Sequence, residues 1–153
     1  MKAVILAGGE AIRLRPLTCN TPKIMLPVLN RPFFEHLIDY LKKHNITDII
    51  LAVGKLSEQI EHYFGDGSKF GVSLAYSTEY FPMGTAGAVK TAERFLDDSF
   101  IVFNGDIFTN IDLSKWKGEI SSGGENGASV FHYKRVKQSQ FTQIYLLLHY
   151  GLG

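Results

Sequence analysis

The chain alternates short apolar runs with longer stretches in which apolar residues recur every three or four positions. Three runs are almost continuously apolar, which is typical of strands covered on both faces: 4–7, 49–53 and 100–103. A fourth run, 72–76, alternates, with Val72, Leu74 and Tyr76 on one side. This alternation predicts a strand that lies nearer the edge of a sheet.

Apolar residues at helical spacing fill the gaps between these runs. The three stripes are Phe34, Leu37, Ile38 and Leu41; Leu56, Ile60, Tyr63 and Phe64; and Val89, Ala92, Phe95 and Leu96. We expect all three to face the core rather than a cofactor. Pro32 suits the start of the first helix, and Gly65 ends the second. Strands and helices in alternation imply right-handed crossovers, a parallel sheet and an α/β fold.

Length and charge narrow the class of protein. A chain of 153 residues fits one domain with a sizeable core. A net charge of +1 supplies no broad field for nucleic acid or a membrane surface. The apolar run 144–148 is far shorter than the ~20 residues of a membrane helix, and the first apolar run has no signal-peptide cleavage site. With the single cysteine Cys19, these features predict a cytoplasmic protein.

The most informative stretch is 3–27, where the first apolar run ends in Gly8 and Gly9. Three cations follow in a short loop: Arg13, Arg15 and Lys23. Glycine lets backbone N–H groups approach phosphate oxygens closely, and the cations can neutralise the charge. We therefore expect this loop to receive a polyanion. A tight turn followed by a solvated basic loop is the alternative interpretation of the glycine pair alone.

A second candidate segment follows the apolar run 100–103. Ligands of parallel sheets bind outside the carboxyl ends of the strands, so Gly105 and Asp106 should lie at the same rim as the glycine pair. A carboxylate there can hold Mg²⁺ while phosphate oxygens fill other coordination positions. A turn aspartate that caps the next segment is the alternative. The chain has neither a Walker motif nor G-x-G-x-x-G, which argues against those nucleotide-binding classes.

The ordered string G-G-x-x-x-R-x-R-P-L-T-x-x-x-P-K resembles the opening signature of the sugar-nucleotide pyrophosphorylases. These nucleotidyltransferases join a nucleoside triphosphate to a sugar 1-phosphate. The resemblance covers about residues 1–116, is greatest to mannose-1-phosphate guanylyltransferases, and implies a three-layer, Rossmann-like, mostly parallel sheet of the glycosyltransferase-A kind. Two positions depart: Ala11 replaces a glycine and Ile12 a threonine. A Cβ at Ala11 costs about 1 kcal/mol or more if φ must be positive.

The resemblance also implies roles for particular residues. Lys23 would contact phosphate near the reacting centre, Arg13 would contact the β and γ phosphates, and Asp106 would hold Mg²⁺. The nucleotide-binding residues that it implies are Leu6, Ala7, Gly8, Gly9, Glu79, Gly84, Thr85, Asn104 and Gly105. Arg15 either contributes to phosphate binding or packs on the loop.

The segment 79–87 resembles the base-recognition loop of the same family, which often reads P-L-G-T-A-G. Glu79 stands where related enzymes place a residue facing the edge of the base. A carboxylate accepts two hydrogen bonds side by side, which suits the N1–H and N2–H₂ donors of guanine. Uracil and thymine would be better served by an amide. The segment therefore favours GTP, with a surface glutamate before a turn as the alternative.

Beyond residue 116 the resemblance fades. A polar, glycine-rich stretch at 117–127 precedes a predicted strand at 128–133, and the apolar segment 143–150 has no pattern that identifies its type. Members of the family continue well past this length, and their later part supplies much of the sugar pocket and a second metal-binding aspartate. We therefore expect a truncated domain, divided into a nucleotide-binding part, 1–116, and a divergent segment, 117–153, that either completes it or is an aberrant tail.

The leading prediction is an enzyme that forms a GDP-mannose-like nucleotide sugar from GTP and a sugar 1-phosphate, with Mg²⁺ as cofactor and pyrophosphate as second product. Uridylyl or adenylyl transfer to glucose 1-phosphate is an alternative within the class. A nucleotide-binding module without turnover and a truncated product are further alternatives. We expect no nucleic-acid or membrane partner, and the sequence leaves a homo-oligomer open.

Overall fold

The structure, a computed structural model, describes residues 1–54, 56–79, 81, 84–96 and 99–113, together with the backbone of 144–148. The strand predicted at 128–133 lies outside these residues, as does the rest of the divergent segment up to residue 143. Within the described part, no helix is both long enough and apolar enough to cross a bilayer.

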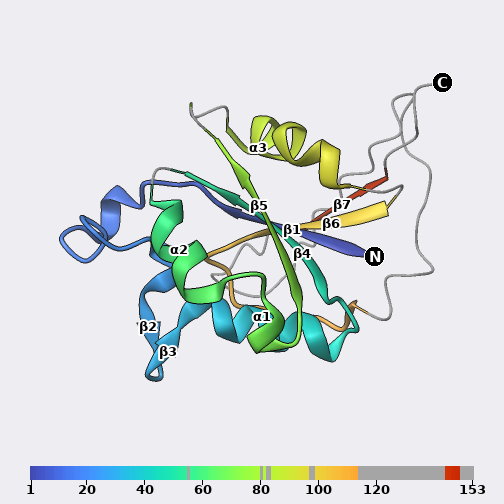
Figure 1. Cartoon of the computed structure of the whole chain (residues 1–153), viewed down its shortest axis with the longest axis horizontal. Helices are drawn as coiled ribbons and strands as arrows, with labels where there is room; N and C mark the ends of the chain where they lie inside the picture. The colour runs from blue at the N-terminus through green and yellow to red at the C-terminus, as the bar shows by residue number, and fades with distance from the viewer. Residues whose placement is uncertain (55, 80, 82–83, 97–98, 114–143, 149–153) are drawn as a thin grey trace, which may run out of the picture.

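A five-stranded sheet forms the centre of the described chain, in the order β5-β4-β1-β6-β7 (Figure 1). Its strands are β1 (Lys2–Ala7), β4 (Asp48–Val53), β5 (Ser73–Thr78), β6 (Ser99–Asn104) and β7 (Ile144–Leu148). The first four are parallel, and β7 runs antiparallel to β6. The four predicted strands are confirmed with small shifts at their ends, and β5 lies at an edge, as its alternating pattern predicted.

The order of the strands places the first strand in the middle of the sheet. β1 pairs with β4 on one side, Ala3 opposite Ile49, and with β6 on the other, Lys2 opposite Phe100. The chain thus moves outward from β1 through β4 to β5 and then returns to the far side of β1. Such a reversal leaves a crevice at the carboxyl ends of the two strands that flank it, here β1 and β6.

Helices cover both faces of the sheet and make three layers, as the resemblance implied. α1 (Phe33–Lys43) and α2 (Ser57–Phe64) lie on one face, and α3 (Gly84–Ala92) lies on the other (Figure 1). Pro32 precedes the first turn of α1, where its missing N–H costs no hydrogen bond. Gly65 ends α2 with φ +55°, a conformation that glycine adopts without strain.

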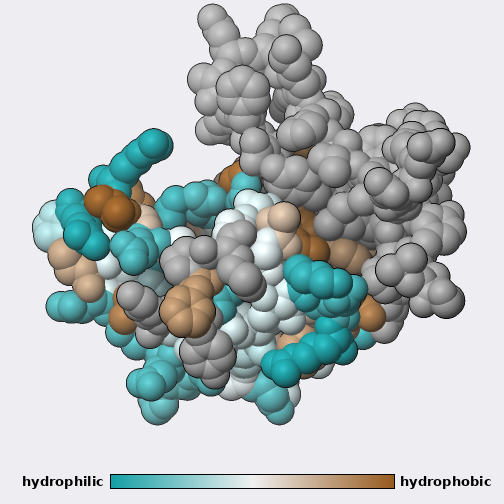
Figure 2. Space-filling model, turned by 90° about the horizontal axis from the view of Figure 1, so that it is seen from above, coloured by the Kyte–Doolittle hydropathy of each residue, from teal (hydrophilic) through white to brown (hydrophobic). Residues whose placement is uncertain are grey.

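Short elements complete the described chain. A two-stranded antiparallel hairpin, β2 (Pro27–Val28) with β3 (Arg31–Pro32), precedes α1. The single 3₁₀ turns are η1 (Ile12–Leu14), η2 (Lys23–Met25), η3 (Ser68–Phe70) and η4 (Glu93–Phe95). The loop that carries η1 projects from one end of the molecule, and Figure 2 shows hydrophilic and apolar residues side by side at that end. The exposed apolar residues of this loop include Ile12 and Leu17.

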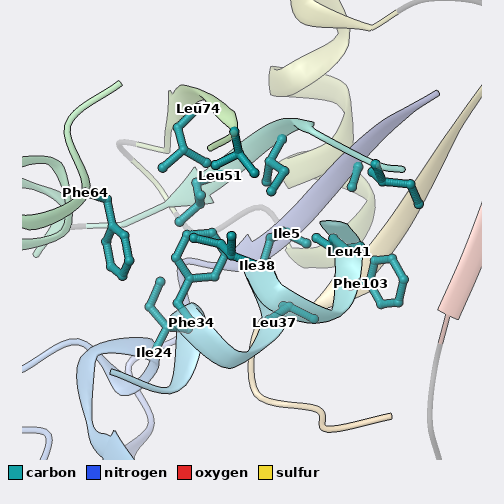
Figure 3. Packing of buried hydrophobic residues seen from close by; sticks show 14 of the residues in the cluster. Ile5, Ile24, Phe34, Leu37, Ile38, Leu41, Leu51, Phe64, Leu74 and Phe103 are labelled. Carbon is teal, nitrogen blue, oxygen red and sulfur yellow. The ribbon is translucent and has the colours of Figure 1, made fainter. Parts of the chain in front are cut away.

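The core differs between the two faces of the sheet. Under α1 and α2 it is built from large side chains, and Figure 3 shows Phe34, Ile38 and Leu51 grouped there, with Phe64 beside them. The rings of Phe34 and Phe64 meet edge to face, with centroids 4.9 Å apart. Under α3 the core contains small residues, among them Ala52, Ala88 and Ala92. Small side chains allow a helix to lie close to a sheet, so α3 can hold its first turn near the strand ends.

Two residues that were predicted to face the core, Leu56 and Tyr63, are exposed instead. Leu56 is 38% exposed because it precedes the first residue of α2, so it lies outside the buried face of that helix. Tyr63 is 40% exposed, and its hydroxyl donates a hydrogen bond to Glu35 at 2.7 Å. The other stripe residues are buried or packed against the core.

Candidate active site

A pocket of about 490 Å³ opens at the carboxyl ends of β1 and β6. The end of β1 with its glycine pair, the 3₁₀ turn η2, the residue after β5, the first turn of α3 and the end of β6 form its walls. Eleven residues predicted for the site line it: Leu6, Ala7, Gly8, Gly9, Lys23, Glu79, Gly84, Thr85, Asn104, Gly105 and Asp106. Residues from five separate segments thus meet at one rim, which follows from the parallel pairing of the strands.

The twelfth predicted residue, Arg13, lies apart from this group. It sits on η1, is exposed, and does not line the pocket. Arg15 lines a second hollow of about 260 Å³, between the glycine pair and the start of α2. Its guanidinium lies 3.9 Å from the carboxylate of Glu10, and both side chains are more than half exposed. The phosphate-binding role of Arg13 stays a prediction.

Lys23 and Asp106 form an ion pair in the wall of the pocket, where the ammonium Nζ donates to the carboxylate Oδ2. The two residues are 83 positions apart in the chain. Lys23 begins η2, which is anchored by the buried Ile24, and Asp106 follows the buried strand β6. The fold therefore brings together the cation and the carboxylate for which the resemblance implied separate roles.

The donor set around Asp106 suits a magnesium ion. Among the described residues no three His, Cys, Asp or Glu side chains gather into a metal-binding cluster. Mg²⁺, however, commonly takes one or two carboxylates, several waters and the phosphate oxygens of a substrate. Asp106 is 40% exposed. Asn104, whose side chain carries a carbonyl oxygen, lines the same pocket. These residues fit the ion.

Glu79 lies beside the loop 8–18 that follows β1, here called the glycine loop, and one of its carboxylate oxygens lacks a partner. Its Oε2 lies 3.5 Å from the position that a Cβ on Gly8 would take, and its backbone N–H donates to Val53 at 2.9 Å. Oε1 is enclosed and has no hydrogen-bond partner among the described residues. Burial raises the pKa of this carboxyl above its ordinary value. A buried acceptor without a donor costs free energy, and Oε2 is the carboxylate oxygen that lies toward Gly8.

The glycine loop owes its shape to a strained residue and a buried hydroxyl. Ala11 has φ +46°, in the left-handed region, where a non-glycine residue costs about 1–2 kcal/mol. Its carbonyl accepts from the N–H of Leu14 and from the hydroxyl of Thr18, each at 2.9 Å. Thr18 is only 6% exposed. The replacement of glycine at residue 11 is therefore strained, and Thr18 helps to hold it.

Two glycines allow the ends of the strands to approach each other. A Cβ on Gly54 would lie 2.9 Å from the carbonyl oxygen of Gly8, and one on Gly105 would lie 2.8 Å from that of Leu6. The sequence reasoning missed Gly54, and it assigned no role to Thr18 beyond its match to the family string. The position of Gly54, directly after a buried strand, was the available signal, since Gly8 stands in the same place after β1.

Residues 2–144 match the family described as nucleotidyl transferase. The chain is 44% identical over 117 residues to the D-glycero-alpha-D-manno-heptose 1-phosphate guanylyltransferase of Campylobacter jejuni, covering 76% of this chain and 52% of that protein. It is 40% identical over 126 residues to the UTP–glucose-1-phosphate uridylyltransferase of Synechocystis, covering 74% and 32%. It is also 40% identical over 114 residues to the mannose-1-phosphate guanylyltransferase of Mycobacterium tuberculosis, again covering 74% and 32%. The chain thus spans between about a third and a half of the length of these curated relatives.

Solved structures agree with the sequence matches. A Bacillus anthracis protein described as a glucose-1-phosphate thymidylyltransferase superposes with a TM-score of 0.77 at 28% identity, covering 97% of this chain and 71% of that one. HddC from Yersinia pseudotuberculosis gives a TM-score of 0.76 over 96% of this chain and 76% of that one; at 24% identity it supports the fold alone. With the α/β fold and the family match in agreement, the chain belongs to the nucleotidyl transferase family.

Proposed function

We propose that this chain carries the nucleotide-binding part of a sugar-1-phosphate nucleotidyltransferase. In that reaction a phosphate oxygen of the sugar 1-phosphate forms a bond to the α-phosphorus of the nucleotide, and the bond from that phosphorus to the bridging oxygen breaks. Pyrophosphate leaves with the electron pair. The observation that carries the proposal is the single pocket that gathers the glycine loop, Lys23, Asp106 and Glu79.

The proposed roles follow from the charge that this reaction concentrates. Several phosphate groups converge, so catalysis depends on positioning and charge neutralisation. Lys23 would bind phosphate with its ammonium, and the backbone N–H groups near Gly8 and Gly9 would approach phosphate oxygens. Asp106 would hold Mg²⁺, which when bound neutralises negative charge on those oxygens. Arg13 would reach the β and γ phosphates from outside the pocket wall.

We further propose that the nucleotide is GTP. The support is the position of Glu79 in the lining of the pocket, with its Oε2 beside Gly8, because an ionised carboxylate can accept from both N1–H and N2–H₂ of guanine. Gly84, with φ +70° at the first residue of α3, leaves the backbone open to the base. Guanylyl and uridylyl transferases both occur among the relatives at about 40% identity, so the base must be tested directly.

Calorimetric titration of wild type and Glu79→Gln with GTP and UTP in the presence of Mg²⁺ tests this choice. We expect wild type to prefer GTP and the glutamine variant to lose about tenfold or more of that preference, as hydrogen bonds to charged groups contribute about 1.5–3 kcal/mol. Glu58→Gln, on the exposed face of α2, is the matched control and should behave as wild type. A wild-type preference for UTP would contradict the assignment of GTP.

Mass spectrometry of the products from GTP with mannose, heptose or glucose 1-phosphates tests the activity. We expect a GDP-sugar from wild type and a loss of about 100-fold or more in Lys23→Ala and Asp106→Ala, since single groups that stabilise transition-state charge are worth that much. Lys43→Ala, at the exposed end of α1, serves as control. Turnover by both variants at the wild-type rate would contradict the proposed roles.

A nucleotide-binding module without turnover is the second candidate. The strained Ala11 in the glycine loop and the position of Arg13 outside the pocket favour it. In that case titration would show binding of GTP, while no nucleotide sugar would form with any of the sugar phosphates.

A further inference from the structure

We propose that Lys23 acts as a built-in counterion that occupies the cation position at Asp106 until a metal-bound triphosphate enters the pocket. Binding of the metal to the carboxylate then frees the ammonium for phosphate. The inference rests on the proposed function for the identity of the ligands and adds to it an order of events at the same site.

The contact that carries the inference joins two residues with separate proposed tasks. Nζ of Lys23 donates directly to Oδ2 of Asp106. Within the described part of the chain, the charged side chains that line this pocket are Lys23, Glu79 and Asp106. The ammonium thus pairs with the carboxylate that faces the proposed metal position, whereas Oε1 of Glu79 is left without a partner.

A metal ion and an ammonium compete for this carboxylate. Both draw on the same oxygen lone pairs, and the positive charge of Lys23 repels an incoming cation at short range. The pair is nevertheless easy to displace, because its side chains are 35% and 40% exposed and water screens such pairs strongly. A triphosphate that arrives with the metal offers Lys23 a replacement partner of higher charge.

Only the side chains need to move in this exchange. The turn that contains Lys23 is held by the N–H of Met25, which donates to the carbonyl of Pro22 at 2.9 Å. The residue before Asp106 is tied to β1 by the N–H of Gly105, which donates to the carbonyl of Leu6 at 2.9 Å. With both backbones fixed, rotation about side-chain bonds is enough to separate the two charges.

The exchange makes metal and nucleotide depend on each other. Without nucleotide, a metal ion must displace Lys23 and leave it without a partner. Without metal, a triphosphate must draw Lys23 away and leave Asp106 facing phosphate charge. By linkage, each ligand should therefore raise the affinity of the other by the same factor.

Binding of Mn²⁺ alone, as a stand-in for Mg²⁺, tests the competition on the whole chain. The paramagnetic resonance signal of free Mn²⁺ reports the affinity without any need for turnover. We expect Lys23→Met to bind Mn²⁺ about two- to tenfold more tightly than wild type, a range set by the modest strength of exposed ion pairs. Lys23→Arg, which keeps the charge, should stay near wild type, and Asp106→Asn should lose the binding.

Lys90→Met is the control for the change in net charge. Lys90 pairs with Glu93 at 2.7 Å on the outside of α3 and does not line the pocket, so its removal should leave Mn²⁺ affinity unchanged. Equal Mn²⁺ affinity in Lys23→Met and wild type would overturn the inference. Binding that persists in Asp106→Asn would overturn it as well, since the metal would then lie elsewhere.

Titration with GTP and Mg²⁺ separates this inference from the proposed function. Lys23→Met should bind the nucleotide more weakly while it binds Mn²⁺ alone more tightly, so the two effects have opposite signs. If wild type bound no nucleoside triphosphate, the proposed function would fail, and a gain in Mn²⁺ affinity would still place Lys23 as counterion. If wild type bound the nucleotide but Lys23→Met and wild type bound Mn²⁺ equally well, the inference alone would fail.

Discussion

At the scale of residues, Ala11 and Thr18 shape the loop that follows β1. A Cβ at residue 11 is costly only when φ is positive. The structure gives φ +46° and a buried Thr18 that holds the carbonyl of the same residue. Thr18 was visible in the matched string, but no pattern in the sequence links its hydroxyl to a residue seven positions earlier.

Ala11→Gly should stabilise the folded chain. Glycine removes a strain of about 1–2 kcal/mol but adds about 0.4–1 kcal/mol of freedom to the unfolded chain, so the free energy of unfolding should rise by up to about 1.6 kcal/mol. Urea unfolding measures this change. Ala86→Gly, in the exposed first half of α3, is the matched control and should lower the free energy of unfolding by about 0.5–1 kcal/mol. A loss of stability in Ala11→Gly would contradict the strain.

Glu79 should give GTP binding a distinctive pH dependence. Burial raises the pKa of its carboxyl above the ordinary value of 4.5. On acidification from neutral pH, the carboxyl therefore takes up its proton before an ordinary glutamate does and can no longer accept both guanine hydrogen bonds. We expect the GTP affinity of wild type to fall as this carboxyl takes up its proton, and titration with GTP at several pH values measures the fall. Glu79→Gln should lack this fall and keep only the pH dependence that comes from the phosphates.

The same shift affects stability with a defined sign. Because the folded chain binds this proton at higher pH than the unfolded chain, the contribution of Glu79 to stability is present at low pH and is lost as pH rises through the raised pKa. At neutral pH, Glu79→Gln should therefore unfold at a higher urea concentration than wild type in the absence of ligand. The difference should shrink below pH 4.5, and a constant difference across pH would contradict it.

At the scale of elements, the sequence predicted strands well because an almost continuous apolar run has few alternatives. It predicted the ends of helices less well. Leu56 matched the spacing of α2 but lies outside the helix. Spacing shows which residues could share a face, and the backbone decides where that face starts.

Close approach of strand ends makes some glycines structural. Gly105→Ala would place a Cβ 2.8 Å from the carbonyl oxygen of Leu6 and 3.0 Å from Cγ2 of Ile24, so the ends of β6 and β1 must separate. We expect a loss of about 1–3 kcal/mol in the free energy of unfolding, which is typical of an overpacked core. Gly9→Ala is the control because a Cβ there meets no atom within 4 Å. Thermal unfolding of both variants measures the difference, and equal midpoints would contradict it.

At the scale of the whole molecule, alternation along the chain predicted a parallel sheet and a shared rim, but it did not predict the order of the strands. The order depends on pairings between residues about 100 positions apart, such as Lys2 with Phe100. Strand β7 shows the same limit, because its short apolar run fits a helix equally well until it is seen to pair with β6. The local pattern fixes elements, whereas the long-range pairing locates the crevice.

The larger core face should dominate stability. Phe34 has no exposed surface and packs against Phe64, so Phe34→Ala should lower the free energy of unfolding by about 3–5 kcal/mol. That is a large part of the roughly 5–15 kcal/mol typical of a folded domain. Urea unfolding measures it. Phe108→Ala, at a residue that is 64% exposed, should cost well under that amount, and a similar loss in both variants would contradict the assignment of the core.

The sheet places Glu79 and Asp106 after β5 and β6, two strands that are separated by β4 and β1. The residue proposed to read the base and the residue proposed to hold Mg²⁺ therefore follow different strands, and each can change without the other. A substitution at residue 79 would then change the preferred base and leave the surroundings of Asp106 intact, so the same fold can suit different nucleotides.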